Sequence, residues 1–370
     1  MSRFFYNIEK LRTFACIMVI ICHMHFCLFV AYIPKCLFEV HGVVQLFFTI
    51  SGFVYTYSIK NYLPQNGTFL ERLKISQQFL KQLCFKRFFR ICPVMFFIFI
   101  LTGIFYLFSS NDFSWFFIWR KAPFQILTGI FNEICQNTPE RTSVFALGLG
   151  HFWTIAIEFP FYLLWPILLL IFKNNGSRAI FSLLLGLFTL FIFQYIVIVF
   201  CGYRYYSTYN NVATMFLGAF FAFIYEHLLL FVKKIKLFIH HKTFFEVFQI
   251  FLLVLAFWVI PKTSDLTKFW THCVIQLLSV VIVVISVLNN ENETWGDRIL
   301  VYIGRRSYSL YAIHILVIKV NVLFANILQI FYENSKFLNL LIFMLTLWGS
   351  TELTYNYIEK PFRKLRNTWF

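Results

Sequence analysis

Charged residues are scarce in this chain of 370 residues. They make up 13% of it, and Asp and Glu number only 16 against 32 Lys and Arg. An average soluble domain has about 25% charged and about 45–50% apolar residues, whereas 60% of this chain is hydrophobic and 22% is aromatic. One water-soluble core cannot bury that much apolar surface. The shortage of charge therefore excludes an ordinary soluble domain.

Several chemical signatures are also missing. The chain has no Gly-rich phosphate loop, no G-x-S-x-G nucleophile turn and no H-E-x-x-H metal motif. Its nine cysteines include no C-x-x-C pair, and most lie in or beside apolar runs, where a free Cys acts as a small hydrophobe. These gaps disfavour a bound metal, a permanently bound cofactor and a disulfide framework.

Long apolar runs fill the chain instead. A membrane-spanning helix needs about 20 mostly apolar residues, and such runs predict an all-α polytopic membrane bundle of about ten helices rather than a barrel of short alternating strands. The first run is longer than the roughly 7–15 residues of a signal peptide's apolar region, so we expect it to remain uncleaved. We expect spans at about 13–32, 42–60, 91–108, 152–172, 179–200, 211–232, 244–260, 269–288, 307–330 and 337–358.

The basic residues predict the orientation of these spans. The net charge of +16 comes from Lys and Arg that concentrate in alternate loops, and cytoplasmic loops are the ones enriched in them. Both termini are therefore predicted to be cytoplasmic, and nucleic-acid binding is disfavoured. The longest segments between spans are about 61–90 inside and about 109–150 outside. We therefore expect residues 1–370 to form a single integral-membrane domain without an appended soluble domain.

Two ionisable residues bracket the first apolar run, LRTFACIMVIICHMHF at 11–26. Arg12 and His23 are eleven positions apart, which on a helix returns to the same face about 16 Å further along. Arg12 could be an interfacial anchor, and His23 could bridge two helices. An ionisable group at membrane depth also indicates function. His25 lies about 200° around the helix from His23 and should face elsewhere.

Two further segments carry ionisable residues near apolar runs. In CFKRFFRICPVMFF, Arg87 and Arg90 share a helix face, which indicates either a phosphate site or a topology signal. In GHFWTIAIEFPFYLLWP, His151 and Glu158 are seven apart. An unpaired carboxylate within a span costs about 2.5–3.5 kcal/mol. We therefore expect Glu158 to face a partner, water or the bundle interior.

Two segments near the end complete the set. In IGRRSYSLYAIHILVI, Tyr311 and His314 share a face of an apolar run. In YIEKPFRKLR, Pro361 disfavours helix at the residue before it. We therefore expect the last helix to stop here and to be followed by a basic cytoplasmic tail.

Taken in order, six segments resemble the integral-membrane acyltransferase 3 family, whose members O-acylate cell-surface carbohydrates and other exported molecules. They are IEKLRTFACIMVIICH, LFFTISGFVYTY, KRFFRICPV, HFWTIAIEFPFYLLWP, IGRRSYSLYAIHILV and YIEKPFRKLR. Each is weak alone, but together they cover nearly the whole chain. Glu9 and Lys10 replace the family's usual Asp-Gly, and Cys92 replaces its usual Tyr. YNNVATMFLGAFFA lacks the Arg and Asp often found there.

The resemblance implies a reaction and a site. An acyl group, usually acetyl, would pass from cytosolic acyl-CoA to a hydroxyl of a cell-surface saccharide, a lipid-linked glycan or a similar exported acceptor, in a bacterial inner membrane. A base working near neutral pH suits this chemistry, and a histidine is one. The implied catalytic residues are His23, Arg12 and Glu158, the implied CoA-binding residues are Arg87 and Arg90, and further candidates are Ser51, Trp153, Tyr311 and His314.

Two other classes of function remain open from the sequence. A secondary transporter or proton-coupled carrier also places His, Glu and Arg inside a bundle, but it would favour an internal repeat, and none is evident. A non-catalytic membrane scaffold would not need a buried histidine and glutamate.

Overall fold

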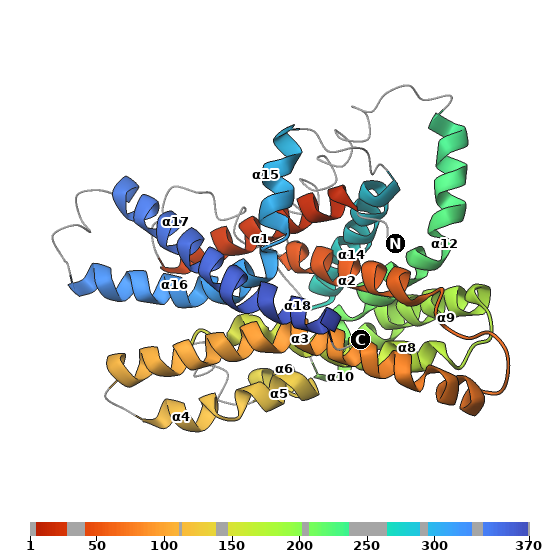
Figure 1. The fold of residues 1–370 in the computed structure, drawn as a ribbon, viewed down its shortest axis with the longest axis horizontal. Helices are drawn as coiled ribbons and strands as arrows, with labels where there is room; N and C mark the ends of the chain where they lie inside the picture. Colours follow the sequence, from red (N-terminus) through yellow and green to blue (C-terminus); the bar gives the residue numbers. More distant parts are fainter. Residues whose placement is uncertain are drawn as a thin grey trace. The chain divides into compact units, whose positions relative to one another are not determined.

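The computed structural model describes residues 5–27, 41–110, 113–137, 147–201, 207–236, 265–288, 295–327 and 336–368. These residues are helical or irregular, with no strand among them (Figure 1). The span expected at about 244–260 lies outside them. The main helices are α1 (Tyr6–Cys27), α2 (His41–Ile59), α3 (Phe69–Ser109), α8 (Trp153–Leu169), α9 (Asn175–Leu187), α10 (Gln194–Cys201), α12 (Ala213–Lys236), α14 (Asp265–Leu288), α15 (Trp295–Gly304), α16 (Ser307–Ile327), α17 (Lys336–Leu353) and α18 (Lys360–Thr368).

Shorter elements join or extend these helices. They are α4 (Ser114–Trp119), α5 (Ala122–Thr128), α6 (Phe131–Asn137), the 3-10 turn η2 (Gly150–Phe152), the π-helical turn η3 (Phe188–Phe193), α11 (Thr208–Asn211) and the π-helical turn η4 (Thr354–Glu359).

Seven helical segments in the described part of the chain are long and apolar enough to cross a membrane. They are Gly42–Ile59, Phe69–Ser109, Gly150–Leu169, Asn175–Phe200, Ala213–Lys234, Phe269–Leu288 and Ser307–Phe324. Each overlaps one of the ten predicted spans, so the prediction of a polytopic helical membrane protein is confirmed. The spans expected at 13–32 and 337–358 are helical where they are described, in α1 and α17, but they are not among these seven.

Two compact units make up the chain. The first contains Met1–Ala15, Glu39–Gln78 and Phe161–Gly304, and the second contains Cys16–Phe38, Phe79–Pro160 and Arg305–Phe370. Helices α1, α3 and α8 each contribute residues to both units. Each unit is therefore assembled from segments that lie far apart in the sequence.

The segment at about 61–90, expected to lie between two spans on the inside, is largely helical. Helix α3 runs for 41 residues, which is about 60 Å at 1.5 Å per residue. The backbone N–H of Thr68 donates to Glu71 Oε2 at 2.7 Å, and the N–H of Glu71 donates to Thr68 Oγ1 at 3.4 Å. This reciprocal pair is a capping box that fixes the start of the helix. Strong helix formers such as Leu, Lys, Gln and Arg then continue it.

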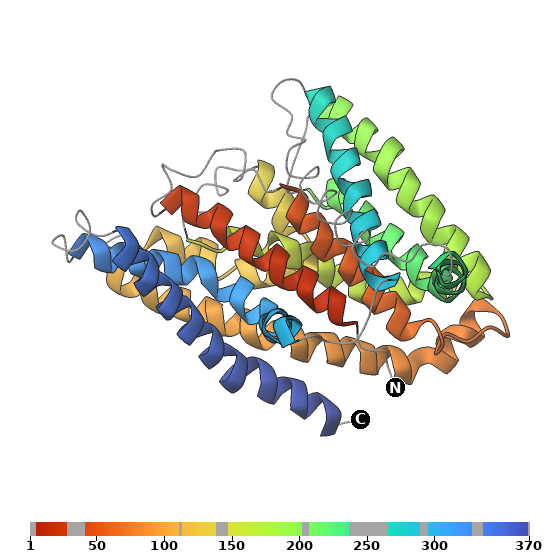
Figure 2. The same ribbon diagram turned by 90° about the horizontal axis from the view of Figure 1, so that it is seen from above.

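The helix stop expected at Pro361 is wrong, because the helix continues through this residue. Helix α17 continues through the π-helical turn η4 into α18 (Figure 2). The backbone N–H of Lys360 donates to the carbonyl of Tyr355, and Lys360 keeps α-helical angles of φ −65° and ψ −44°. The wider turn carries the chain past a proline that lacks an N–H and would crowd the preceding turn of a regular α-helix.

In the first unit, two glycines let helices α2 and α12 approach closely. A Cβ added to Gly52 would collide with the backbone of Met215, and one added to Gly218 would collide with the backbone of Thr49. Small residues at a crossing are how helices in a membrane come into direct backbone contact. The glycine of the motif LFFTISGFVYTY therefore has a packing role in this chain.

Candidate functional site

Three histidines from distant segments come together in the second unit. His23 lies on α1, His151 lies in the turn η2 before α8, and His314 lies on α16. His314 Nε2 and His23 Nδ1 are 2.9 Å apart, within hydrogen-bonding distance. The ring centroids of His151 and His314 are 5.1 Å apart. His23 and His314 are separated by 291 residues in sequence, so the tertiary fold builds this cluster.

Backbone carbonyls hold two of the three rings. His314 Nδ1 bonds to the carbonyl of Tyr311, and His151 Nε2 bonds to the carbonyl of Ala312 at 3.1 Å. A carbonyl oxygen only accepts, so each of these ring nitrogens donates. His314 and His151 are 0% and 5% exposed, whereas His23 is half-buried. Of the three histidines, His23 is the most exposed.

The hydroxyl of Tyr311 links α16 to η2 by a hydrogen bond. Its hydroxyl donates to the carbonyl of His151 at 2.7 Å and lies 3.1 Å from Thr154 Oγ1. Gly148, just before η2, has a φ of +75°, and a Cβ there would press on the side chains of Ile315 and Lys319. Glycine permits both this conformation and the close approach to α16. These contacts set the position of His151.

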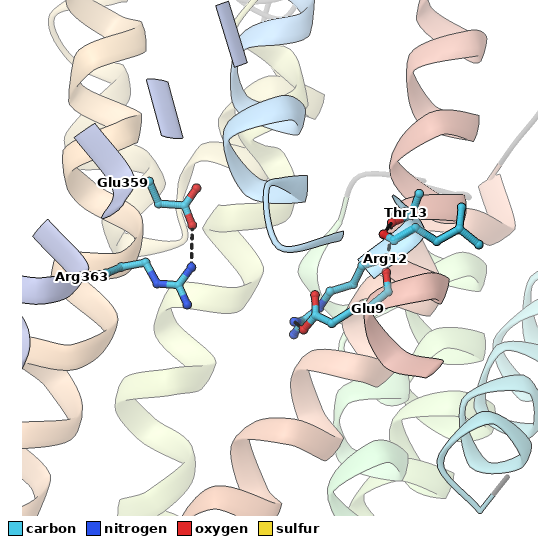
Figure 3. A network of polar contacts seen from close by, with 6 residues as sticks. Glu9, Arg12, Thr13, Glu359 and Arg363 are labelled. Atoms are coloured by element: carbon cyan, nitrogen blue, oxygen red, sulfur yellow. Dashed lines mark hydrogen bonds and ion pairs between the residues drawn. The ribbon is translucent and has the colours of Figure 1, made fainter. Parts of the chain in front are cut away.

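A buried carboxylate lies in the same unit, near the start of α16. Glu359, in η4, is 2% exposed. Its Oε2 accepts a hydrogen bond from Ser309 Oγ at 2.6 Å, and its Oε1 pairs with Arg363 Nη1 at 3.1 Å (Figure 3). A buried charge is stable only with such partners. The π turn thus holds Glu359 where a residue of α16 can bond to it.

Tyr308 lies between this carboxylate and two of the predicted site residues, Glu158 and Arg90. Its hydroxyl donates to the carbonyl of Ile91 at 2.6 Å. It also lies within electrostatic range of Glu158, Glu359 and Arg90. We call Arg90, Glu158, Tyr308, Ser309, Glu359 and Arg363 the charged cluster of the second unit. Along α16, Tyr308, Tyr311 and His314 follow at three-residue spacing, and the helix rises about 9 Å from Tyr308 to His314.

Two of the predicted site residues belong to the first unit. Arg12 Nη1 pairs with Glu9 Oε1 at 2.7 Å, one turn earlier on α1 (Figure 3), and its side chain is 14% exposed. Thr13 Oγ1 donates to the carbonyl of Leu300 on α15. Ser51 lies on α2 beside Gly52. The structure therefore gives Arg12 a carboxylate partner within its own helix.

The remaining predicted residues lie in the second unit. Trp153 is the first residue of α8 and is buried, and Glu158 is half-buried on the same helix. Arg87 and Arg90 are half-buried on α3. The side chain of His25 lies outside what the structure describes. Within the described ranges, no group of three or more His, Cys, Asp or Glu side chains is arranged to hold a metal ion.

A neutral polar network occupies part of the first unit. It includes Asn210 of the segment YNNVATMFLGAFFA, where the family that the sequence resembles often has Arg and Asp. The carbonyl of Asn210 accepts from the side chains of Gln194, Gln276 and His272 at 2.7, 2.6 and 2.9 Å. The helix formed by α9, η3 and α10 runs beside α14 here (Figure 2). Amides thus satisfy the buried backbone without a charge in the membrane.

Sequence reasoning missed a buried arginine in the first unit. Arg178 is 0% exposed, and it donates to the carbonyls of Leu169 and Phe172, at the end of α8, and to those of Leu63 and Pro64. In the sequence, Arg178 is one of the basic residues between the spans expected at 152–172 and 179–200. A single sequence holds no signal that separates it from an exposed lysine nearby.

Comparisons with known proteins extend these observations. The sequence profile described as an acyltransferase domain, acyltransferase 3, matches residues 5–355. O-acetyltransferase OatA of Staphylococcus aureus (strain NCTC 8325) is 25% identical over 384 residues, covering 98% of this chain and 58% of that protein. A Staphylococcus aureus (strain COL) protein named as a candidate O-acetyltransferase is 23% identical over 337 residues, covering 87% and 52%. The chain thus spans about half the length of these curated relatives. No solved structure matches it.

Proposed function

This chain belongs to the acyltransferase 3 family, and on that basis we propose that it is a membrane O-acetyltransferase that takes acetyl groups from acetyl-CoA and places them on a hydroxyl of an exported saccharide. The relatives are named as O-acetyltransferases of a bacterium, which supports the acetyl group, the oxygen acceptor and the bacterial cytoplasmic membrane. The CoA donor and the saccharide follow from the resemblance and from the chemistry below.

The single observation that carries the proposal is the environment of His23. It is half-buried in an apolar helix and bonds to His314 at 2.9 Å, next to a third buried histidine. Ionisable groups inside membrane helices are rare and usually functional. A histidine that remains reachable beside two buried ones suits a base for an alcohol substrate.

The reaction that we propose is a direct transfer. His23 removes the proton from the acceptor hydroxyl as the oxygen attacks the thioester carbonyl. The new carbon–oxygen bond forms a tetrahedral intermediate whose negative oxygen needs a cation or a hydrogen-bond donor. The carbon–sulfur bond then breaks, and the protonated histidine returns its proton to the departing thiolate. The products are the acetyl ester and free CoA thiol.

The charged cluster suits the other end of the donor. CoA carries several phosphate charges, and Arg side chains match phosphate geometry with two parallel hydrogen bonds. Arg90 belongs to the cluster, and Arg87 lies one turn earlier on α3. Tyr308, in the same cluster, and His314, which holds His23, are six residues apart on α16, a rise of about 9 Å. An elongated donor can therefore bind its phosphates near Arg90 while its thioester approaches His23.

Glu158 has a structural role in this proposal. Its half-buried carboxylate lies in the charged cluster with Arg90, where an opposite charge stabilises the arginine that is to bind phosphate. Arg12, paired with Glu9, supplies positive charge at the basic end of α1.

The experiment that tests the proposal measures both products, the transferred acetyl group and the released CoA thiol. Membranes that contain the chain are incubated with acetyl-CoA labelled in the acetyl group and with a panel of bacterial envelope glycans. We expect alkali-labile radiolabel on a glycan and an equal amount of released CoA thiol. Thiol release without an ester would indicate hydrolysis. Neither signal above membranes that lack the chain would refute the proposed function.

The donor argument requires that the basic loops face the cytoplasm. Gly67 lies in an exposed turn between α2 and α3, and Phe113 is an exposed residue after α3. Alkaline phosphatase is active only outside the cytoplasm, so a fusion after Gly67 should be inactive and a fusion after Phe113 should be active. The reverse pattern would place the arginines on the wrong side for cytosolic CoA.

Arg90 gives a second test of the donor site. Arg90→Ala should raise the KM for acetyl-CoA about tenfold or more, because a hydrogen bond to a charged group contributes about 1.5–3 kcal/mol. Arg90→Lys should recover only part of this, since the forked donor is lost. Lys81→Ala removes an exposed cation from the same helix and should leave KM unchanged. Equal effects of the Arg90 and Lys81 variants would reduce Arg90 to general surface charge.

A further inference from the structure

The hydrogen bonds of the histidine cluster form a directed chain. His314 Nδ1 lies against the carbonyl of Tyr311, one turn back on α16, and His314 Nε2 lies 2.9 Å from His23 Nδ1. A carbonyl oxygen has no proton to give. Its neighbour, His314 Nδ1, must therefore carry the hydrogen in that bond.

This fixes the remaining protons one after another. A neutral imidazole has one N–H and one bare nitrogen, so a neutral His314 that donates from Nδ1 has a lone pair on Nε2. That lone pair faces His23 Nδ1, which must then be the donor in the 2.9 Å bond. His23 therefore keeps its own hydrogen on Nδ1, and its Nε2 is left bare.

We propose that His314 is a positioning residue for the reaction: it accepts the Nδ1–H of His23 and thereby makes Nε2 of His23 the basic atom. The inference rests on the proposed function and extends it, since it names which nitrogen takes the acceptor's proton and which residue selects that nitrogen. His314 itself is 0% exposed, so it acts on the reaction through His23.

The same bond stabilises His23 after it takes the proton. An imidazolium donates from both nitrogens, and His314 Nε2 is already placed to accept from one of them. The other groups that face this pair are His151, whose ring lies 5.1 Å from that of His314, Tyr311, whose ring lies 5.6 Å away, and the backbone carbonyl of Val19, one turn back on α1, which also accepts a hydrogen bond from the His23 ring. His151 donates Nε2–H to the carbonyl of Ala312. Its bond is therefore directed at the backbone, and His314 is the histidine that bonds to His23.

The experiment compares two side chains of similar length at position 314. His314→Gln keeps an oxygen that can accept from His23, whereas His314→Met fills similar space without a comparable acceptor. We expect His314→Met to lower kcat about 10–100-fold, the usual effect of losing a group that orients a functional histidine. The KM for acetyl-CoA should not change. His314→Gln should recover much of the lost rate.

The pH profile separates positioning from packing. In His314→Met, the acidic limb of the kcat/KM profile should move to lower pH, because protonated His23 has lost its acceptor and the base stays free in more acidic solution. His314→Gln should restore the limb. The matched control is His272→Leu, which removes another buried histidine bonded to a backbone carbonyl. Its profile should keep its shape even if less protein accumulates.

Each failure has its own signature. Equal losses in His314→Gln and His314→Met with an unchanged pH profile would mean that His314 only packs, and so would failure of both variants to accumulate in the membrane. Full activity of His314→Met would also overturn the inference. The proposed function fails separately, if the unmodified chain transfers no acetyl group or if His23→Ala transfers it normally.

Discussion

Replacement of His23 by alanine is expected to abolish acetyl transfer while the protein still reaches the membrane in normal amounts. A positioned general base contributes about 10²–10⁴ in rate, and Ala leaves neither a base nor a donor toward His314. The loss should appear in kcat, because His23 lies away from the phosphate-binding end of the proposed donor site. Steady-state kinetics with labelled acetyl-CoA, on membranes matched for protein content, measure it.

Two control measurements test whether this loss is specific to His23. His25→Ala removes a histidine from the same helix about 200° around its axis, so transfer should stay close to normal. Binding of acetyl-CoA to His23→Ala, measured by equilibrium dialysis, should match that of the unmodified chain. If His25→Ala is the inactive variant, or if His23→Ala retains transfer, another group must remove the proton.

Arg178→Ala is expected to have the largest effect on stability. The buried guanidinium donates to four carbonyls and to Asn175 Oδ1, at 2.6–3.4 Å. A buried polar group left without a partner costs about 1–3 kcal/mol, and removing Arg178 leaves several backbone carbonyls without their donor at once. Positive charge at the end of α8 is lost as well. We expect a loss of several kcal/mol, seen as a much lower melting temperature in detergent.

The control for Arg178 lies five residues away. Lys173 is also basic but exposed, so Lys173→Ala should leave the melting temperature near that of the unmodified chain. Arg178→Lys should be intermediate, because one ammonium cannot reach all the carbonyls that a fork reaches. A melting temperature for Arg178→Ala equal to that of Lys173→Ala would contradict the structural role.

The sequence predicted membrane helices where apolar length alone decides. Seven of its ten spans coincide with long apolar helices. It was less informative about the polar segments between the spans. The segment before Arg90 is polar yet helical, and the pair Thr68 and Glu71 was the available signal, because Thr followed three residues later by Glu marks a helix start. At Pro361 the prediction used the rule that proline disfavours helix at the residue before it. The preceding turn of this helix is the wider π turn η4, which accommodates the proline.

The candidate site was harder to predict because it depends on pairs distant in sequence. Spacing places Tyr311 and His314 on one side of a helix, but nothing local indicates that His314 meets His23, 291 residues away. His151 was noticed only for its spacing from Glu158. Glu359 was seen as part of a helix end, whereas the structure buries it against Ser309. The sequence supplies the residue types, and the tertiary fold supplies their partners.

The π turn η4 has a consequence for how this helix can vary during evolution. Each residue inserted into or deleted from a helix rotates everything beyond it by about 100° and shifts it by 1.5 Å. Residues 354–359 already contain a widened turn, and Glu359 and Arg363 bond across its end. Losing one residue there would turn Arg363 and the rest of α18 to another side. A one-residue gap in this segment is therefore a larger change than many side-chain substitutions, and relatives that differ in length there should be compared by their contacts before their alignment columns.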